Sequence, residues 1–241
     1  MSGYDKSPDY GGPPFRWREL IIPAIVIIAV ALVWVFWPSK AGAGSQVRVV
    51  DGDTIELDGV TYRLHGIDAP EAGQKCRKAS GGCWPCGKDA IAVMESLVIG
   101  EAVTCDNRGI DDYSRVIGVC SVNGQDINAR MVSKGYAWVF RKYSLDYAAL
   151  EDTARAARLG IWQADTQTAW DYRAERWDVG VQESPEGCPI KGNISKNGRI
   201  YHAPWSPWYS RTKVSVDKGE RWFCDEAEAL QAGWRAPYWG R

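Results

Sequence analysis

The pattern of apolar and polar residues divides the chain into three differently built regions. Residues 20–37 form an apolar run without a charged side chain. From Gln46 onward, apolar residues alternate with polar ones, which is typical of half-buried β-strands, and after residue 165 both patterns weaken. We therefore expect an apolar helix, a strand-rich domain and a separate C-terminal region.

The apolar run at residues 20–37 predicts a transmembrane anchor. A helix of this length is roughly 27 Å long at about 1.5 Å per residue, which is enough to cross a hydrocarbon core. Trp34, Phe36 and Trp37 lie at one end of the run, where interfacial aromatic residues are common. Since a globular helix usually carries a polar face, a single membrane-spanning helix is the favoured interpretation.

Arginines before the run indicate its orientation. Arg16 and Arg18 precede it, and positive charges favour the cytoplasmic side of a membrane. We expect residues 1–19 to form a disordered cytoplasmic tail, and the chain after the helix to lie in the periplasm or outside the cell. The alternative is a signal peptide that is cleaved near Ala43, so that the remainder is secreted.

Residues 46–164 predict an α+β domain. Asp58 and Gly59 form a hairpin signal between two alternating segments. Five strands with helices after the third and the fifth favour a five-stranded OB-fold β-barrel with three helices, a fold that commonly binds nucleic acid or oligosaccharide. The expected strands are 46–50, 54–57, 61–67, 102–107 and 115–122, and the expected helices are 88–98, 126–134 and 145–159.

The C-terminal region is expected to consist of a linker at residues 165–187 and a small module at residues 188–241. The module contains several tryptophans. Because about 50 residues bury little core, such a module usually needs a covalent staple. Cys188 and Cys224 are most simply a disulfide. Together with His202 they could instead bind zinc, although three ligands are one short of a closed structural zinc site.

Charge and composition exclude several kinds of chemistry. The 241 residues carry 29 basic and 30 acidic side chains, a net charge of −1, so the chain is not a polycation that coats nucleic acid. It has only two histidines, far apart in sequence, which excludes mechanisms built on several imidazoles and the helical histidine pair of zinc proteases. Any phosphate chemistry must come from a few placed side chains.

Three carboxylates, those of Asp53, Asp68 and Glu71, are expected to converge near the ends of neighbouring strands. Without a partner they would repel one another and raise one another's pKa values, whereas a hard divalent cation such as Ca²⁺ or Mg²⁺ would stabilise them. Arg63 and Arg115 carry guanidinium groups, whose paired donors match phosphate oxygens. These residues together predict metal-assisted chemistry on a phosphate.

These residues resemble the thermonuclease family, which is typified by staphylococcal nuclease. The resemblance rests on D-G-D-T at residues 51–54, R-x-x-G-I-D-A-P-E at residues 63–71 and D-x-Y-x-R at residues 111–115, and it covers residues 46–164. It implies an OB-fold endonuclease or exonuclease. Such an enzyme hydrolyses phosphodiester bonds of DNA and RNA by Ca²⁺-assisted attack of water and leaves 3′-phosphate ends.

Residue by residue, the resemblance implies that Asp53 and Asp68 bind Ca²⁺ through their side chains. Ala69 would bind the ion through its backbone carbonyl. Glu71 corresponds to the proposed general base for the attacking water. The two arginines that grip the phosphate in the family correspond to Arg63 and Arg115.

The resemblance also suggests substrate-binding tyrosines, with two departures. Tyr113 and Tyr143 correspond to nucleotide-contacting positions, but Asp112 stands where the staphylococcal enzyme has lysine, and Arg141 replaces the aromatic companion of Tyr143. Residues 45–165 carry a net charge of −3, which should weaken phosphate attraction and flatten its salt dependence. We therefore expect weaker substrate binding than in a basic relative.

All seven cysteines follow the predicted anchor, where an oxidising compartment would permit disulfides. Cys105 and Cys120 face each other in the expected hairpin, close enough to bridge. Cys76 with Cys86 is the favoured pair in the insertion that follows the acidic residues, which would leave Cys83 as the odd thiol. The alternative is a redox or zinc motif at Cys83 and Cys86.

The C-terminal module resembles the small "sunset" modules that are appended to bacterial nucleases of this kind. The resemblance rests on C-P-I-K-G-N-I-S from Cys188, I-Y-H-A-P from Ile200 and R-W-F-C-D-E-A-E-A from Arg221. Such modules have no settled function, so the partner of this module stays open.

Together these features predict a monomeric nuclease that a single helix holds in a bacterial cell membrane, with its catalytic domain outside the cytoplasm. Two other classes compete with this interpretation. One is a non-catalytic OB-fold module that holds single strands by charge and stacking, and the other is an envelope interaction protein that acts through the C-terminal module. The clustered acids favour the enzyme, because a protein that only binds phosphate does not need three carboxylates beside it.

Overall fold

The computed structural model describes residues 46–240. The predicted cytoplasmic tail at residues 1–19 and the predicted anchor at residues 20–37 lie outside this range. Among the helices of residues 46–240, none combines the length and the apolar character that a membrane crossing requires.

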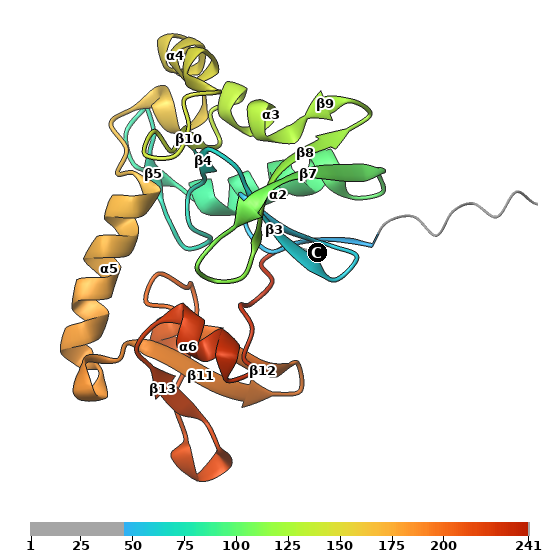
Figure 1. The fold of residues 1–241 in the computed structure, drawn as a ribbon. Helices are drawn as coiled ribbons and strands as arrows, with labels where there is room; N and C mark the ends of the chain where they lie inside the picture. The colour runs from blue at the N-terminus through green and yellow to red at the C-terminus, as the bar shows by residue number, and fades with distance from the viewer. Residues whose placement is uncertain (1–45, 241) are drawn as a thin grey trace, which may run out of the picture. The chain divides into compact units, whose positions relative to one another are not determined.

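The centre of the described chain is a mixed sheet. Its strands follow the order β1-β2-β3-β8-β7, and β9 pairs with β8. Neighbouring strands are antiparallel except β3 and β8, which are parallel. Together with the helices this gives the mixed α+β class that the sequence predicts. The strands are β1 Val47–Val49, β2 Thr54–Leu57, β3 Val60–Leu64, β7 Val103–Ile110, β8 Val116–Val122 and β9 Gln125–Asp126 (Figure 1).

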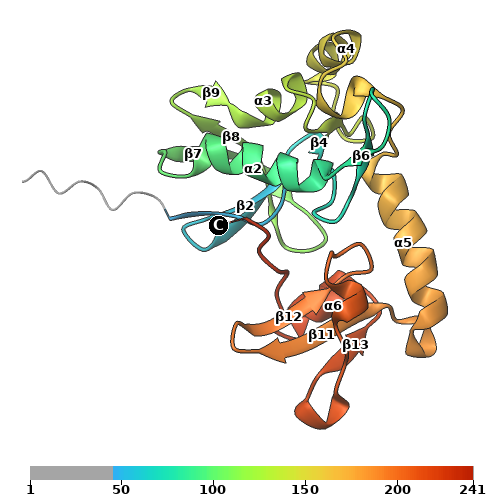
Figure 2. The same cartoon turned by 180° about the vertical axis from the view of Figure 1, so that it is seen from behind.

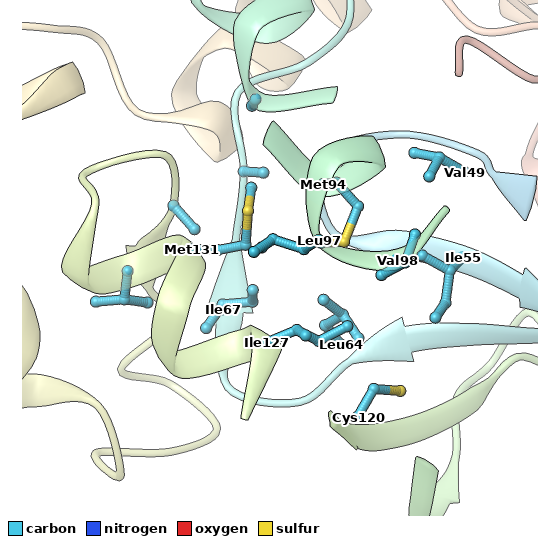
Figure 3. Close-up of a cluster of buried hydrophobic side chains, with 14 of the residues drawn as sticks. Val49, Ile55, Leu64, Ile67, Met94, Leu97, Val98, Cys120, Ile127 and Met131 are labelled. Carbon is cyan, nitrogen blue, oxygen red and sulfur yellow. The ribbon is translucent and has the colours of Figure 1, made fainter. Parts of the chain in front are cut away.

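The main hydrophobic core lies between this sheet and two helices, α2 (Cys86–Val98) and α3 (Ile127–Ser133). Their apolar residues recur every three or four positions, so each helix buries one face. At the start of α3, the Asp126 side chain accepts a hydrogen bond from the backbone N–H of Ala129 and caps the helix. The core residues that are at most 1% exposed include Ile55, Leu64, Met94, Val98, Ile127 and Met131 (Figure 3).

The third expected strand, residues 61–67, is interrupted in the structure. β3 ends at Leu64, and the next short strand, β4 (Ile67–Asp68), pairs with β10 (Trp138–Val139) in a separate sheet. Gly66 between β3 and β4 has a φ of 72°, a conformation that favours glycine. The break places Asp68 outside the main sheet. Side-chain alternation in the sequence does not reveal such a break.

The third expected helix, residues 145–159, is shorter than predicted. α4 spans Ala148–Ala156. The hydroxyl of Ser144 accepts a hydrogen bond from the backbone N–H of Asp146 and so forms a turn before the helix. This local hydrogen bond competes with helix formation at the predicted start.

The structure contains the three predicted disulfides. Cys105 and Cys120 are directly opposed residues of β7 and β8. The Cys76–Cys86 bond joins the hairpin of β5 (Cys76–Arg77) and β6 (Cys83–Trp84) to the start of α2. A cysteine in a disulfide can neither bind zinc nor serve as a redox thiol. The zinc interpretation of Cys188, His202 and Cys224 is therefore wrong for this structure, and so is the zinc or redox interpretation of Cys83 and Cys86. The remaining cysteines are the Cys188–Cys224 pair and the exposed free thiol of Cys83.

Residues 165–187, expected as a linker, contain a helix. α5 spans Ala169–Glu183 and begins at Thr168, whose hydroxyl accepts a hydrogen bond from the backbone N–H of Asp171. Only two residues of α5 are buried, so the helix has no continuous apolar face by which its sequence could be recognised. α5 nevertheless leads from the strand-rich domain to the C-terminal module.

The C-terminal module is a three-stranded antiparallel sheet with one short helix. The sheet order is β12-β11-β13. Ile190, Phe223 and Trp234 are central to its small core, and the Cys188–Cys224 disulfide supplies the expected staple. The elements are β11 Ile190–Ser195, β12 Gly198–His202, β13 Arg221–Phe223 and α6 Glu226–Gln231 (Figure 2).

The last described residues return to the first strands of the sheet. The backbone N–H of Trp239 donates to the carbonyl oxygen of Val50 at 3.0 Å. The hydroxyl of Tyr238 donates to Glu56 on β2 at 2.7 Å. Both ribbon views show this tail running from the module back to the strand-rich domain (Figures 1 and 2). The last described residues therefore lie beside the turn that follows β1.

We predict that the unreduced protein has one reactive thiol, because Cys83 is exposed and the other cysteines are in disulfides. Titration with a thiol reagent should give one equivalent per chain, both in the native state and after unfolding without a reductant. Cys83→Ser should abolish the reaction. Additional reactive thiols in the unfolded, unreduced chain would contradict the disulfide assignments.

Candidate functional site

Two carboxylates from separate segments lie together in the structure. Asp53 belongs to the turn between β1 and β2, Asp68 ends β4, and they are 5% and 0% exposed. Arg63 on β3 binds both carboxylates: Nη1 forms an ion pair with Asp53, and Nη2 lies 2.9 Å from Oδ1 of Asp68. Because a buried charge without a partner is costly, Arg63 stabilises the convergence that the sequence predicts.

Small side chains allow the turn at residues 51–54 to approach the end of β4. A Cβ on Gly52 would lie only 2.7 Å from the Cβ of Ala69. Across this approach, the backbone N–H of Ala69 donates to Oδ2 of Asp53 at 2.6 Å. The hydroxyl of Thr54 donates to Oδ1 of Asp53 at 3.1 Å. Asp53 is therefore oriented from both segments, and Ala69, the predicted carbonyl ligand, is its direct neighbour.

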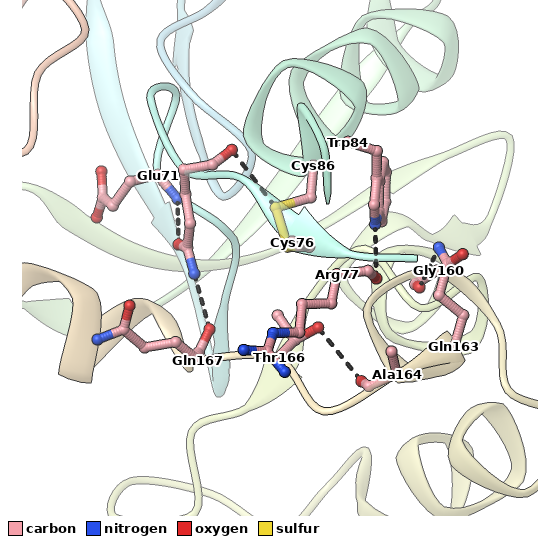
Figure 4. Close-up of a disulfide and its surroundings, with 11 residues drawn as sticks. Glu71, Cys76, Arg77, Trp84, Cys86, Gly160, Gln163, Ala164, Thr166 and Gln167 are labelled. Atoms are coloured by element: carbon pink, nitrogen blue, oxygen red, sulfur yellow. Dashed lines mark hydrogen bonds between the residues drawn. A yellow bond between two sulfur atoms is a disulfide. The ribbon is translucent and has the colours of Figure 1, made fainter. Parts of the chain in front are cut away.

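Glu71 lies on a loop that buried contacts hold in place. Its backbone N–H donates to the side-chain oxygen of Gln74 at 3.1 Å, and the Gln74 amide donates to the Gln167 carbonyl oxygen at 2.7 Å (Figure 4). The Cys76–Cys86 disulfide braces the chain next to Gln74. A Cβ on Gly87 would lie 1.8 Å from the Glu71 carbonyl oxygen, so only glycine lets this loop approach α2.

The structure adds a site residue that sequence reasoning missed. Arg173 on α5 places Nη2 2.7 Å from Oδ2 of Asp68, and Nη1 3.1 Å from Oδ1. The same Nη1 lies 2.7 Å from Oε1 of Glu71. No motif in the sequence marks this arginine. The one available signal was that three converging acids need more positive charge than Arg63 supplies.

Burial and the charges of the cluster shift several pKa values. Burial raises the pKa of Glu71 to about 7; Arg173 opposes this rise, and Asp51 and Asp68 add to it. Burial also raises the pKa of Asp51 and lowers that of Arg63. At Arg173 burial favours the neutral form, but the hydrogen bonds and charges of Asp68 and Glu71 outweigh it and raise the pKa. Arg173 therefore stays a cation.

Arg115 and Tyr113 are both held by Asp111. The Nε of Arg115 lies 2.7 Å from Oδ2 of Asp111. The backbone N–H groups of Arg115 and Tyr113 donate to Oδ1 at 2.9 and 3.0 Å. Burial disfavours the charge on Arg115, but Asp111 outweighs that effect and raises its pKa. The predicted phosphate-binding arginine is therefore oriented by an acid outside the Asp53–Asp68 pair.

A cavity of about 620 Å³ connects these side chains. Asp51, Glu71 and Arg115 line it from the strand-rich domain, and residues of the C-terminal module, among them Trp205 and Glu226, complete the lining. Asp51, the first residue of the D-G-D-T turn, was not predicted as a site residue although it belongs to the same motif. Arg115, the second of the predicted phosphate-binding arginines, therefore lines the same cavity as Glu71.

The two predicted substrate-binding tyrosines have different positions. Tyr113 lines the cavity and is 38% exposed. Tyr143 is 65% exposed and packs against Phe140, with ring centroids 5.0 Å apart, and neither residue is among those that line the cavity. Arg141 binds Glu151 at 2.6 Å, whereas Asp112 lines the cavity. Of the two tyrosines, the structure brings only Tyr113 to the cavity.

The oxygen atoms of the site suit a hard divalent cation, although arginines bind these carboxylates in the described conformation. Carboxylate and carbonyl oxygens, as at Asp53, Asp68 and Ala69, are the ligands that Ca²⁺ prefers. Within residues 46–240, no group of three or more His, Cys, Asp or Glu side chains is spaced to hold a metal ion. Both carboxylate oxygens of Asp68 instead accept hydrogen bonds from Arg173. A cation at Asp68 would therefore have to replace this arginine.

Two family models match the chain. Residues 61–164 match the model described as staphylococcal nuclease homologue, a region that includes Arg63, Asp68 and Glu71. Residues 180–236 match a model described as ArfC. The second match covers most of the C-terminal module, for which the resemblance to sunset modules stays a prediction.

Curated relatives align with 54% to 64% of this chain. An uncharacterized endonuclease of Escherichia coli is 38% identical over 138 residues, which cover 54% of this chain and 84% of the relative. Micrococcal nuclease of Shigella flexneri is 31% identical over 171 residues, covering 64% and 90%. Succinoglycan biosynthesis protein ExoI of Rhizobium meliloti (strain 1021) is 34% identical over 135 residues, covering 54% and 70%.

We predict that Arg173→Gln raises the pKa of Glu71 further, because Arg173 is the cation that opposes the effect of burial. A titration of carboxyl ¹³C NMR signals in the presence of a chelator would measure this shift. The free energy of unfolding should also fall by about 2–4 kcal/mol, near the range for a broken buried ion pair.

Arg176→Gln, on the same helix, is the matched control, since Arg176 lies over the ring of Tyr172. It should leave the pKa of Glu71 close to that of the unsubstituted protein. The same Glu71 pKa in both variants would show that Arg173 does not neutralise the cluster.

Proposed function

Because the chain belongs to the staphylococcal nuclease family, we propose that it hydrolyses the phosphodiester bonds of DNA and RNA with the assistance of Ca²⁺. One observation carries this proposal. Asp53 and Asp68 are buried together and bridged by Arg63, and Glu71 beside them opens onto a cavity of about 620 Å³. This volume lies in the size range of pockets that enclose small molecules, such as one nucleotide unit of a strand.

The residues of the site have distinct proposed roles. The side chains of Asp53 and Asp68 and the carbonyl of Ala69 would hold Ca²⁺, which supplies a Lewis acid for a phosphate oxygen when it is bound. Arg63 and Arg115 would bind the phosphate and stabilise the negative charge that builds up in the transition state. Their fixed partners, the Asp53–Asp68 pair and Asp111, keep both guanidinium groups oriented.

Glu71 would act as the general base. Its carboxylate would accept a proton from the water that attacks phosphorus. The bond between phosphorus and the 5′ oxygen would then break, and the 5′ oxygen would take up a proton from a water molecule, so that cleavage leaves a 3′-phosphate and a 5′-hydroxyl. No step needs a ribose 2′-hydroxyl, which is why both DNA and RNA are proposed as substrates.

The proposed location is a bacterial cell membrane. Residues 20–37 would anchor the chain as a single-pass helix with a cytoplasmic N-terminus, and the nuclease domain would lie outside the cytoplasm. Three disulfides support an oxidising compartment for the described residues. Cleavage near Ala43 and secretion is the alternative location. The protein is proposed to act as a monomer.

We predict that the full chain, purified in mild detergent, cleaves DNA and RNA with Ca²⁺ and loses this activity when a chelator is added. Asp53→Ala should lower the cleavage rate by about 100-fold or more, comparable to the loss of one preorganised electrostatic group. Asp106→Ala changes an exposed aspartate on β7 and should have little effect, which makes it the matched control.

End-group analysis of the products completes this test. Full activity in the presence of a chelator, or products with 5′-phosphate ends, would overturn the proposed mechanism. Strand binding without any cleavage would instead favour the non-catalytic OB-fold alternative.

We predict that Asp112→Lys strengthens the binding of single-stranded DNA, because Asp112 lines the cavity and the domain around it is slightly acidic. The affinity should rise by roughly threefold to tenfold at low salt, and the dependence on salt concentration should become steeper. Fluorescence anisotropy at several salt concentrations would measure both. An unchanged affinity and salt slope would refute the charge explanation.

A further inference from the structure

We propose that the C-terminal module forms the second wall of the substrate cleft and restricts the site to a single nucleic-acid strand with unpaired bases. This inference rests on the proposed nuclease function and assigns the substrate class of that site. It gives a role to residues 188–241, which lie outside the nuclease match at residues 61–164.

Three separate contacts hold the module against the acidic site. The first is Arg173 of α5, which binds Asp68 and Glu71. On the same helix, four residues later, Trp177 packs against Trp205 of the module with ring centroids 6.1 Å apart. α5 therefore connects the buried carboxylates directly to the module.

The second contact is between the Glu71 loop and the module loop of Trp205. A Cβ on Gly73 would lie 3.1 Å from the carbonyl oxygen of Trp205 and 3.4 Å from Pro207. The two loops are thus in van der Waals contact two residues after Glu71. The module covers one side of the loop that carries the proposed general base.

The third contact is the returning tail. Trp239 donates its backbone N–H to Val50, the residue before Asp51, and Tyr238 binds Glu56 through its hydroxyl. The guanidinium groups of Arg48 and Arg235 both lie over the ring of Tyr238, at 4.4 and 4.3 Å from its centroid. Tyr238 therefore serves as a structural clamp, because its hydroxyl and its ring are already engaged by residues of the protein.

Aromatic rings line the cavity from both sides of this arrangement. Tyr113 contributes from the strand-rich domain, and Trp205 and Trp239 contribute from the C-terminal region. Aromatic side chains bind unpaired bases by stacking, which tolerates any base. In a duplex the bases are stacked on one another and paired, so that these faces are not accessible to such rings.

The charge of the lining also favours a single strand. The charged residues that line the cavity comprise five acids and two arginines, so acids outnumber arginines; they are Asp51, Glu56, Glu71, Asp112, Glu226, Arg115 and Arg235. Non-specific duplex binding depends mainly on contacts between basic side chains and phosphates. A cavity with this lining is instead suited to stacking on bases, with Arg115 as the phosphate contact.

The test compares a single strand with a blunt duplex of the same sequence, using the full chain with Ca²⁺. We expect cleavage of the single strand to be at least tenfold faster, and cleavage of a duplex with an overhang to stop near the junction. Equal rates for single strand and duplex would overturn the inference but leave the nuclease function intact. Cleavage of neither substrate would overturn the proposed function itself.

The variant Trp205→Ala tests whether the C-terminal module forms the proposed second wall of the cleft. With a chelator present to prevent cleavage, its affinity for a fluorescein-labelled oligothymidine should fall by about 5- to 100-fold, the effect of losing one base–aromatic stack. Trp222→Ala is the matched control, because Trp222 lies on β13 of the same module and does not line the cavity. Equal affinities of both variants and the unsubstituted protein would refute the role of the wall.

If circular dichroism shows that Trp205→Ala does not fold, Tyr113→Ala serves as the second variant. Tyr113 is exposed at the tip of the opposite wall, so its replacement should spare the fold. Loss of oligothymidine affinity in this variant, with cleavage of single strands still preferred over duplex, supports stacking between two walls. An unchanged affinity contradicts it.

Discussion

The site depends on the neutralisation of buried carboxylates by arginine. Asp53 and Asp68 belong to separate segments, and both are almost fully buried. Arg63 from the main sheet binds both carboxylates, and Arg173 from α5 binds Asp68 together with Glu71. Removing ions from water costs several kcal/mol per group unless they are paired and hydrogen-bonded. The positions of both acidic segments therefore depend on these two guanidinium groups.

Close packing then sets how precisely the acids are placed. Gly52 lets the D-G-D-T turn approach Ala69, and Gly87 lets the Glu71 loop approach α2. Buried Gln74 links that loop to Gln167 at 2.7 Å. The two glycine contacts leave no room for a larger side chain. The Gln74 contact requires a side chain that can donate this hydrogen bond. Such a surrounding is what a site needs if its reacting groups are to stay oriented.

The same ion pairs connect the family domain to the C-terminal region. α5 buries little apolar surface, so its position relies on Arg173 at the acidic cluster and on Trp177 at the module. The returning tail beside Val50 closes the connection from the other end. A module with a small core and one disulfide is thereby held next to the acidic cluster.

The main strands, the first two helices, the Cys105–Cys120 pair and the convergence of Asp53 and Asp68 could be predicted from the sequence, because these features follow from alternation, capping and motif spacing over a few residues. Cys105 and Cys120, for example, were predictable from hairpin register alone. The sequence pattern did not reveal the break at Gly66, helix α5 or the contact of Arg173 with Asp68, which is 105 residues away. No periodic pattern in the sequence marks these features, because burial and opposite charges from distant segments stabilise them.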